Sequence, residues 1–271
     1  MSFRADLHCH TTCSDGSLSP EELIAHAKEI GLSAVSITDH DTVDAYERAI
    51  PAAKKAQIWL GAGVEFSSVD EGLSVHILGY DIDIKNQELK AFCQKHIERR
   101  KDRNRRIIEK LAKKGMVIDQ DALGSGYTIG RPHIALALVE KGYINSIQDA
   151  FNQFIGDGKS CFDPGIPVST DQTIAMIHQA GGKAFIAHPH VLRNQRHISK
   201  LLEKPFDGLE CYYSKCTPEQ ERKWVQLARE KNLIISGGSD FHGAIKPHIP
   251  LGCSWVDQMT FEQIFERQRW K

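Results

Sequence analysis

The sequence predicts an α/β fold in which a mostly parallel sheet is covered by helices. Short apolar runs alternate with helix-like stretches over residues 1–85, and the alternation returns after residue 168. Such a βαβα order is typical of a parallel sheet with helices on its faces. Histidines and acidic residues also gather where the apolar runs end, and in parallel α/β folds the carboxyl ends of the strands form the functional side.

The first half of this pattern begins with a strand at residues 3–10. The helix after it has clear signals at both ends, because Ser19 suits the N-cap, Pro20 the first turn and Gly31 the stop. The other elements expected before residue 85 are strands at 33–41, 58–67 and 73–82, and a helix at 43–57 that is interrupted or ends near Pro51.

The middle of the chain, residues 86–167, breaks the rhythm and is predicted to be an inserted, mainly helical subdomain. A long helical pattern covers 87–116, and shorter ones cover 131–142 and 146–156. We therefore expect residues 1–85 and 168–271 to form one α/β body. Its second part contains helices at 170–182, 197–204 and 217–232, and strands at 183–190, 207–213 and 233–243.

The composition is that of an ordinary globular protein. Hydrophobic residues make up 41% of the 271 residues, and the formal net charge of −1 neither favours nor excludes a nucleic-acid partner. The sequence contains no apolar run of about 20 residues and no apolar core of a signal peptide. Seven scattered cysteines fit a reducing compartment. We expect a cytoplasmic protein with no membrane contact and no obligate protein partner.

The opening stretch DLHCHTTCSDGS is the strongest sign of a metal site. Because side chains alternate along a strand, Asp6, His8 and His10 lie on one face, and two imidazoles at this spacing can reach one ion. Asp15 follows in a loop where Gly16 permits a tight turn. Further imidazoles and carboxylates lie at the other strand ends: His40, Glu65, His76, His188, Asp240 and His242.

A single histidine or aspartate at a strand end is more often a turn or capping residue than a ligand. Six strand ends with mixed imidazoles and carboxylates together favour a metal site. Such ligands, without thiolates, suit Mn²⁺, Fe²⁺ or Zn²⁺ better than a closed structural zinc site. The other histidines are assigned elsewhere: His26, His96 and His178 to helices, His197 and His248 to loops, with His190 left open.

Six motifs, DLHCHTTCSDG, ITDHD, GVE, VHILGY, AHP and GGSDFHG, together resemble the PHP (polymerase and histidinol phosphatase) family of metal-dependent phosphoesterases. They span nearly the whole chain and occur in the family's order. The insertion with GRPHIA is similar to one branch, the 3′,5′-nucleotide bisphosphate phosphatases and ribonuclease AM. The resemblance implies a distorted (β/α)7 barrel with its metal site at the carboxyl ends of the strands, and an insertion that caps the substrate.

The resemblance also implies a centre of three divalent ions, manganese first, with iron or zinc as the alternatives. The first ion would be held by His8, His10, Glu65 and Asp240. Glu65 would bridge to a second ion, which would also be held by His76 and His188. The third ion would be held by Asp15, His40 and His242.

Three residues of the insertion are candidates for substrate binding. In the branch, Arg131 and His133 correspond to phosphate-binding residues, and an arginine fork matches phosphate oxygens in kind. From the residues alone, Arg131 would be assigned to the surface and Pro132 to a helix start. Arg100 falls on the apolar stripe of the long helix, where a charge is unusual and a phosphate partner would explain it.

The chain departs from the branch after the strand at 207–213. A histidine-containing stretch is expected there, but the sequence is ECYYSKCT, with Tyr213 and Cys216 in the corresponding positions. This departure concerns substrate contacts near Glu210 and leaves the nine expected metal ligands complete.

We therefore predict hydrolysis of a nucleotide phosphate monoester, above all the 3′-phosphate of a 3′,5′-nucleotide bisphosphate such as 3′-phosphoadenosine 5′-phosphate. The metals would activate water, and Arg131 and His133 would neutralise phosphate oxygens. Asp240, His242 and His133 are candidates for the group that protonates the leaving oxygen. Three alternatives stay open: a 5′–3′ exonuclease on short 5′-phosphorylated RNA or DNA, a histidinol-phosphate-type phosphatase, and a non-catalytic module that metals only stabilise.

Overall fold

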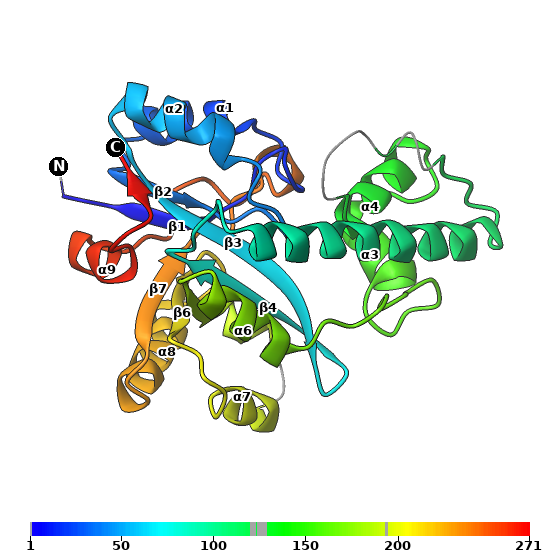
Figure 1. Cartoon of the computed structure of the whole chain (residues 1–271). Helices are drawn as coiled ribbons and strands as arrows, with labels where there is room; N and C mark the ends of the chain where they lie inside the picture. The colour runs from blue at the N-terminus through cyan, green and yellow to red at the C-terminus, as the bar shows by residue number, and fades with distance from the viewer. Residues whose placement is uncertain (1, 120–122, 124–128, 193–194) are drawn as a thin grey trace. The chain divides into compact units, whose positions relative to one another are not determined.

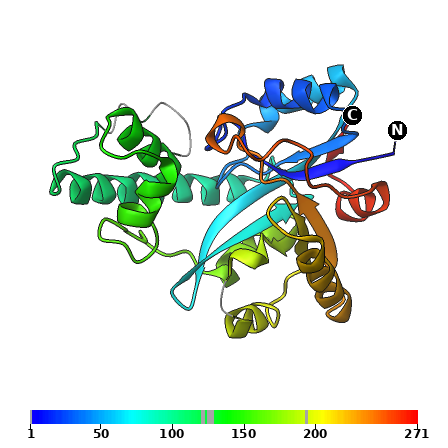
Figure 2. The ribbon, with the colours of Figure 1, turned by 180° about the vertical axis from the view of Figure 1, so that it is seen from behind.

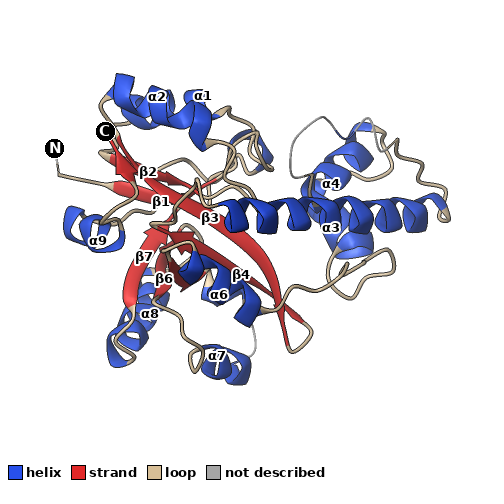
Figure 3. Ribbon diagram, in the orientation of Figure 1, coloured by secondary structure: helices blue, strands red, loops and turns tan. Residues whose placement is uncertain are grey.

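The computed structural model describes residues 2–119, 123, 129–192 and 195–271. The chain divides into two compact units, Met1–Phe92 with Val168–Lys271, and Cys93–Pro167. The first unit contains the sheet, and the second is helical (Figures 1 and 3). The second unit covers most of the interruption in the βα pattern, with its start at Cys93 instead of residue 86.

One sheet organises the first unit, and its strands are neighbours in sequence order (Figure 2). They are β1 (Ala5–Cys9), β2 (Ala34–Ile37), β3 (Trp59–Asp70), β4 (Leu73–Tyr80), β5 (Lys183–Ile186), β6 (Gly208–Tyr213) and β7 (Ile234–Gly238). The pairs β1–β2, β2–β3, β5–β6 and β6–β7 are parallel. The short strand β8 (Arg269–Trp270), which the sequence did not predict, pairs with β3.

Strand β4 is the exception, because it runs antiparallel to both of its neighbours. The chain enters it from β3 through a two-residue turn at Glu71 and Gly72, whose φ angles are 46° and 80°. Two central residues with positive φ form the tight hairpin turn whose twist matches the flanking strands. No crossover helix intervenes, so the strand direction has to reverse.

The two ends of the sheet approach each other and nearly close a barrel. The amide of Asp240 donates to the carbonyl of His8 at 2.8 Å, and the amide of His10 donates to the carbonyl of Phe241 at 2.9 Å. Gly238 lies so close to the backbone of His8 that a Cβ would not fit. The predicted distorted barrel is confirmed, and its closure joins the strands that carry the first and last predicted ligands.

Helices of the first unit cover the barrel and begin at clear sequence signals. Ser19, Ser169 and Thr217 each cap a helix with a complete capping box. The helices are α1 (Pro20–Glu29), α2 (Tyr46–Ala56), α6 (Thr170–Gln179), α7 (Gln195–Leu201), α8 (Pro218–Glu230) and α9 (Gln258–Ile264), which the sequence did not predict. Short 3₁₀ turns lie at η3 (Pro189–Val191) and η4 (Gly243–Ile245).

The expected break of α2 near Pro51 is wrong, because the helix continues through this residue to Ala56. Proline removes one backbone donor, and the buried face formed by Tyr46, Ala49 and Ala53 holds the helix together on both sides of it. The expectation of a loop at His197 is also wrong. This histidine lies in α7, where it is buried and its Nε2 is 3.0 Å from Asp70 Oδ2.

The second unit has its own hydrophobic core. Helix α3 (Gln87–Ala112) enters it from the first unit and contributes Ile107 and Leu111, which are fully buried. The other elements are α4 (Arg131–Glu140), α5 (Ile147–Ala150) and a π-helical turn, η2 (Phe151–Ile155). Ile134, Ala135 and Leu138 of α4 pack against this part of α3. The capping role of this unit stays a prediction.

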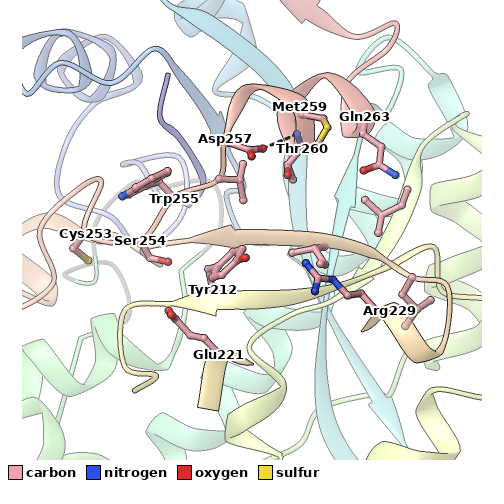
Figure 4. Close-up of a pocket in the computed structure, with 14 residues that line it drawn as sticks. Tyr212, Glu221, Arg229, Cys253, Ser254, Trp255, Asp257, Met259, Thr260 and Gln263 are labelled. Atoms are coloured by element: carbon pink, nitrogen blue, oxygen red, sulfur yellow. Dashed lines mark hydrogen bonds between the residues drawn. The ribbon is translucent and has the colours of Figure 1, made fainter. Parts of the chain in front are cut away.

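One surface hollow of about 590 Å³ lies beside α8, β7 and α9 (Figure 4). Tyr212, Arg229, Trp255 and Met259 are among the residues that line it. It contains none of the nine predicted metal ligands, because it opens near the amino-terminal end of β7. Among the described residues, the helices are too short or too polar to cross a membrane.

Candidate metal centre

The nine predicted ligands lie at one end of the barrel. His8 is in β1 and His10 directly follows it, while Asp240 and His242 follow β7. His76 reaches the same end by a different route. It lies near the start of the antiparallel strand β4, where it pairs with Ser67, two residues beyond Glu65 in β3. His76 was expected at a strand end like the others, and this expectation is wrong. The antiparallel hairpin of β3 and β4 brings the start of β4, and with it His76, to the end of the barrel where the other ligands lie.

The ligand atoms form three overlapping groups in which all atoms lie within 4.8 Å of one another. The first group matches the first predicted ion: His8, His10, Glu65 and Asp240. The second contains His40, Glu65 and His76. The third contains His10, Asp15, His40 and His242. His40 therefore belongs to two groups, and His10 joins the third group in addition to the three residues that the resemblance implies. His188, which the resemblance assigns to the second ion, is in none of these three groups.

Glu65 is the centre of the arrangement, and only 1% of its surface is exposed. Its Oε1 lies 2.8 Å from His76 Nδ1 and 2.9 Å from His188 Nε2. Its Oε2 faces three other ring nitrogens at 3.2–3.3 Å, those of His8, His10 and His40. A carboxylate with a different set of imidazoles on each oxygen has the geometry of a bridging ligand.

The donor chemistry fits divalent ions. His10 Nε2 is buried and makes no hydrogen bond within the described residues, although Glu65 Oε2 lies at 3.2 Å and Asp240 Oδ1 at 3.4 Å. A buried polar atom without a hydrogen bond is costly, and an ion between these three groups would remove that cost. The ligand atoms are imidazole nitrogens and carboxylate oxygens, the set that suits manganese, iron or catalytic zinc.

Electrostatics keep the acidic groups ionised. Burial alone would raise the pKa of Asp15, Glu65 and Asp240, but opposite charges outweigh it and hold all three pKa values well below their usual range. The facing histidines supply these charges at Asp15 and Glu65, while Lys246 is the largest contributor at Asp240, followed by His242. Burial would likewise lower the pKa of His8, but the Glu210 and Glu65 carboxylates raise it well above its ordinary value. Ionised carboxylates are the form that binds metal.

Hydrogen bonds fix the orientation of two imidazoles. His8 Nδ1 lies 2.8 Å from Glu210 Oε1, while His8 Nε2 faces the cluster. His242 Nδ1 lies 2.9 Å from the carbonyl oxygen of Asp240, which can only accept, so this nitrogen carries the proton. In a neutral ring the other nitrogen, His242 Nε2, is therefore bare, and it faces Asp15 Oδ1 at 3.3 Å.

Glu210 and Asp39 support the site without belonging to the predicted ligand set. Glu210 also accepts the backbone amide of His188 at 2.6 Å and is 1% exposed. Asp39 accepts from the amide and hydroxyl of Thr11 and from the hydroxyl of Ser14, which holds the loop before Asp15. The acidic residues in GLE and TDHD were the available sequence signals for both roles.

The backbone is strained where it delivers two of these side chains. His188 has a φ of 28° and Asp240 a φ of 58°, values that residues other than glycine rarely adopt. Such conformations cost about 1–3 kcal/mol and persist where the surroundings impose them, often at functional sites. Here the hydrogen bonds from the His188 amide to Glu210 and from the Asp240 amide to His8 hold both turns.

In the second unit, Arg131 and His133 lie in the first turn of α4. The Arg131 guanidinium donates to Asp157 Oδ1 at 2.5 Å and lies over the rings of Phe151 and Phe162. His133 Nδ1 accepts the amide of Gly130 at 3.0 Å, so a neutral ring carries its proton on Nε2. Arg131 therefore already has an anionic partner, and His133 has the tautomer of a hydrogen-bond donor.

Arg100 lies in the same unit and is only 6% exposed, as its place on the apolar stripe predicts. A Cβ at Gly130 would be 3.3 Å from Arg100 Nη1, so the guanidinium lies against the N-cap of α4. Asn104, one turn further along α3, donates to the carbonyl of Ile129 at 2.8 Å. These contacts hold Arg100 beside the start of α4.

A match with a family model shows which protein family the chain belongs to. The model of the PHP domain matches residues 6–155, more than half of the chain. The chain belongs to the PHP family. It is 34% identical to the 5′-3′ exoribonuclease Rnm of Escherichia coli, over 93% of this chain and 87% of that protein. It is 30% identical to the 3′,5′-nucleoside bisphosphate phosphatase of Chromobacterium violaceum, over 88% and 86%.

Two solved structures resemble this chain along most of its length. A Bifidobacterium adolescentis protein described as a metal-dependent phosphoesterase has a TM-score of 0.86 and 33% identity, over 96% of this chain and 94% of that one. A Chromobacterium violaceum protein described as an amidohydrolase with bound sulfate and no metal has a TM-score of 0.82 and 29% identity, over 88% of this chain and 87% of that one. This PHP protein is a metal-dependent phosphoesterase that hydrolyses phosphoester bonds and uses divalent metal ions.

Proposed function

We propose that this PHP protein hydrolyses the P–O3′ bond of a nucleotide that carries a 5′-phosphate. The observation that carries the proposal is the cluster around Glu65, whose two oxygens each face a separate set of imidazoles. We assign it three divalent ions, with manganese first and iron or zinc as alternatives. When bound, such ions activate a water molecule and neutralise charge on the phosphoryl oxygens.

Two named relatives favour this bond. One is called a 5′-3′ exoribonuclease and the other a 3′,5′-nucleoside bisphosphate phosphatase. Release of a 5′-nucleotide from the 5′ end of RNA and removal of a 3′-phosphate from a 3′,5′-bisphosphate both break the P–O3′ bond beside a 5′-phosphate. The substrates differ only in what the phosphoryl group carries on its far side. A 3′,5′-nucleotide bisphosphate is then the smallest substrate, and short 5′-phosphorylated RNA is the extended one.

The insertion supplies the proposed phosphate-binding residues. Arg131 and Arg100 would bind phosphate oxygens, since a guanidinium donates two parallel hydrogen bonds to such groups. Because Arg131 already pairs with Asp157, phosphate would have to share or replace that partner. His133 would donate through Nε2, the nitrogen that carries the proton while Nδ1 accepts the Gly130 amide.

Two of the three candidate proton donors are poorly suited to that task. Asp240 is held ionised, and its Oδ2 accepts hydrogen bonds from Tyr213 and Lys246. The Nδ1 proton of His242 is directed to the carbonyl of Asp240, and its Nε2 is bare. We therefore assign Asp240 and His242 to metal binding alone, and His133 to hydrogen bonding at the leaving oxygen.

Product analysis tests this proposal. Manganese-loaded protein is incubated with adenosine 3′,5′-bisphosphate and, separately, with short RNA bearing either a 5′-phosphate or a 5′-hydroxyl. We expect AMP and inorganic phosphate from the first, successive 5′-nucleotides from the 5′-phosphorylated RNA, and much slower reaction of the 5′-hydroxyl RNA. Release of the 5′-phosphate, or equal rates for both RNAs, would overturn the proposal. Stabilisation by manganese without hydrolysis of any phosphoester would favour a purely structural role for the metals.

A further inference from the structure

Asp240 makes different contacts through its two carboxylate oxygens. Oδ1 is turned toward the metal cluster, 3.6 Å from His8 Nε2 and 3.4 Å from His10 Nε2. Oδ2 is turned away and accepts the hydroxyl of Tyr213 at 2.7 Å and the ammonium of Lys246 at 2.7 Å. Asp240 is only 5% exposed, so its carboxylate is shielded from solvent. His242 Nδ1 also lies 3.4 Å from Oδ1.

The chemistry of a carboxylate makes this division meaningful. Each oxygen has about two acceptor positions, and two donors at 2.7 Å fill those of Oδ2. The plane of the carboxylate is then fixed, and Oδ1 is the oxygen left to contact an ion. Without these donors, rotation about the Cβ–Cγ bond would exchange the two oxygens or allow both to approach the cluster.

Both donors are held in place by the fold. Tyr213 is the last residue of β6, is 4% exposed, and packs its ring 4.3 Å from that of His190 and 5.8 Å from that of His188. An ionised carboxylate oxygen can only accept, so the hydroxyl of Tyr213 is the donor in its bond to Asp240 Oδ2. Lys246 directly follows η4, the short turn that comes after His242, so its position is tied to the same loop that carries Asp240.

Tyr213 is also one of the two residues, with Cys216, at which the resemblance implies a departure from this branch of the family. A tyrosine in this position brings a hydroxyl within 2.7 Å of Asp240 Oδ2. The departure noted in the sequence thus falls on a contact with a proposed metal ligand.

We propose that Tyr213 and Lys246 are positioning residues, which hold Asp240 so that a single oxygen, Oδ1, serves as the ligand in the first metal group. The inference rests on the proposed metal centre. Loss of either donor should weaken metal binding and lower kcat, because an incorrectly placed ligand weakens both the ion's attachment and its alignment. KM for the phosphate substrate should change little, since neither residue is assigned to phosphate binding.

The test compares Tyr213→Phe and Lys246→Met with two matched controls. Tyr212→Phe changes the neighbouring tyrosine, which lines the surface hollow away from the ligands (Figure 4), and Lys215→Met changes an exposed lysine on the following loop. Manganese affinity is measured on metal-free protein by competition with a fluorescent chelator, without substrate. Removal of a residue that orients a ligand typically costs 10- to 100-fold in metal affinity or activity. We expect a loss of about this size for both test variants and none for the controls.

Three further comparisons separate positioning from a general effect on folding. Saturating manganese should restore much of kcat in Tyr213→Phe, whereas a folding defect would not respond. Lys246→Arg, which keeps a cationic donor, should bind manganese more tightly than Lys246→Met. The double variant should lose less than the product of the two single losses, since both donors act on one oxygen.

Wild-type manganese affinity in Tyr213→Phe and in both Lys246 variants would overturn the inference, as would equal losses in the controls. Because the affinity is measured without substrate, this result is independent of the substrate assignment. The proteins could also show the expected losses of manganese affinity while the wild-type protein cleaves no P–O3′ bond. This result would overturn the proposed function and leave the positioning role of Tyr213 and Lys246 intact. If Lys246→Met does not fold, Tyr213→Phe and Lys246→Arg still decide the question.

Discussion

The imidazole of His8 and the carboxylate of Glu210 form a fully buried pair, with Nδ1 and Oε1 separated by 2.8 Å. The two residues are 202 positions apart in the sequence and come from β1 and β6. Glu210 also accepts the amide of His188 through its other oxygen. One carboxylate therefore positions two proposed ligands, a common arrangement of histidine and carboxylate around a metal.

The first prediction concerns this pair. Glu210→Gln should weaken manganese binding and lower kcat by about 10- to 100-fold, because the amide orients His8 less firmly and no longer makes it a stronger base. Chelator competition and steady-state kinetics measure the two effects. Glu230→Gln, at the exposed end of α8, serves as the control. Unchanged affinity in Glu210→Gln would show that Glu210 has no role in orienting His8.

Glu65 should be the most sensitive position in the cluster. Glu65→Ala removes the carboxylate shared by two ligand groups, so both should lose ions. Metals contribute several kcal/mol to stabilisation of the transition state, and each 1.4 kcal/mol corresponds to tenfold in rate. We therefore expect kcat to fall at least about 100-fold, together with a lower metal content measured by elemental analysis. His8→Ala should act in the same direction. Full activity of either variant would refute the ligand assignment.

The stability of the metal-free protein should depend on pH through His10. Burial alone would lower the pKa of this imidazole, but the facing Asp240 and Glu65 carboxylates raise it to about 9. A raised pKa stabilises the folded state fully below the ordinary histidine value of about 6.5 and no longer does so above about 9. The Tm of the metal-free protein should therefore fall as the pH rises from 6.5 to 9.

Manganese should reverse this trend, because an ion displaces the His10 proton and binds better as that proton is lost. The increase in Tm on adding manganese should therefore grow between pH 6.5 and pH 9. Thermal unfolding with and without the ion measures both curves, and His26→Gln, a change in α1 outside the cluster, should leave them as they are. A manganese effect of constant size across this range would argue against proton displacement.

The closure of the barrel should be intolerant of a side chain at Gly238. A methyl group there would collide with the backbone of His8. Either β1 or β7 would then have to move. Overpacking of this kind typically costs about 1–3 kcal/mol. We expect Gly238→Ala to lower the free energy of unfolding by that amount and to weaken manganese binding. A variant that loses neither property would show that β1 and β7 can separate without disturbing the site.

The ion pair between Arg131 and Asp157 allows a test of the insertion. If phosphate competes with Asp157 for the guanidinium, Asp157→Asn should lower KM, while Arg131→Met should raise it. A partly exposed ion pair is worth about 0–1 kcal/mol, so the gain should not exceed about fivefold. Steady-state kinetics with adenosine 3′,5′-bisphosphate measure both changes. No change of KM in Arg131→Met would remove this residue from the proposed phosphate site.

The regular alternation of apolar runs and helix signals predicted a mostly parallel sheet covered by helices, and the resemblance to the PHP family implied that this sheet forms a barrel. Because parallel strands all run in the same direction, their carboxyl ends lie at the same side of the sheet. This rule placed most of the ligands together without any knowledge of contacts. The position of His76 near the start of β4 could not be predicted, because it depends on the direction of this strand. The turn at Glu71 and Gly72 sets that direction. A local turn here has a consequence for the whole sheet.

The supporting contacts could not be predicted, because they join segments that only the closed fold brings together. Tyr213 and Lys246 meet at Asp240 from different strands and loops, and Glu210 meets His8 across the barrel. Burial of His197 against Asp70 was missed for the same reason. The polar context of a histidine in sequence does not reveal whether a distant carboxylate covers it.

The most direct test of the central claim is a manganese titration of chelator-stripped protein, with AMP released from adenosine 3′,5′-bisphosphate as the measured product. We predict no release without the ion, an increase that saturates with manganese, and release from Glu65→Ala at least about 100-fold slower at every concentration. The opposite outcome is that the stripped protein, or Glu65→Ala at saturating manganese, releases AMP as fast as the manganese-loaded wild-type protein. Either result would contradict a metal centre built around Glu65.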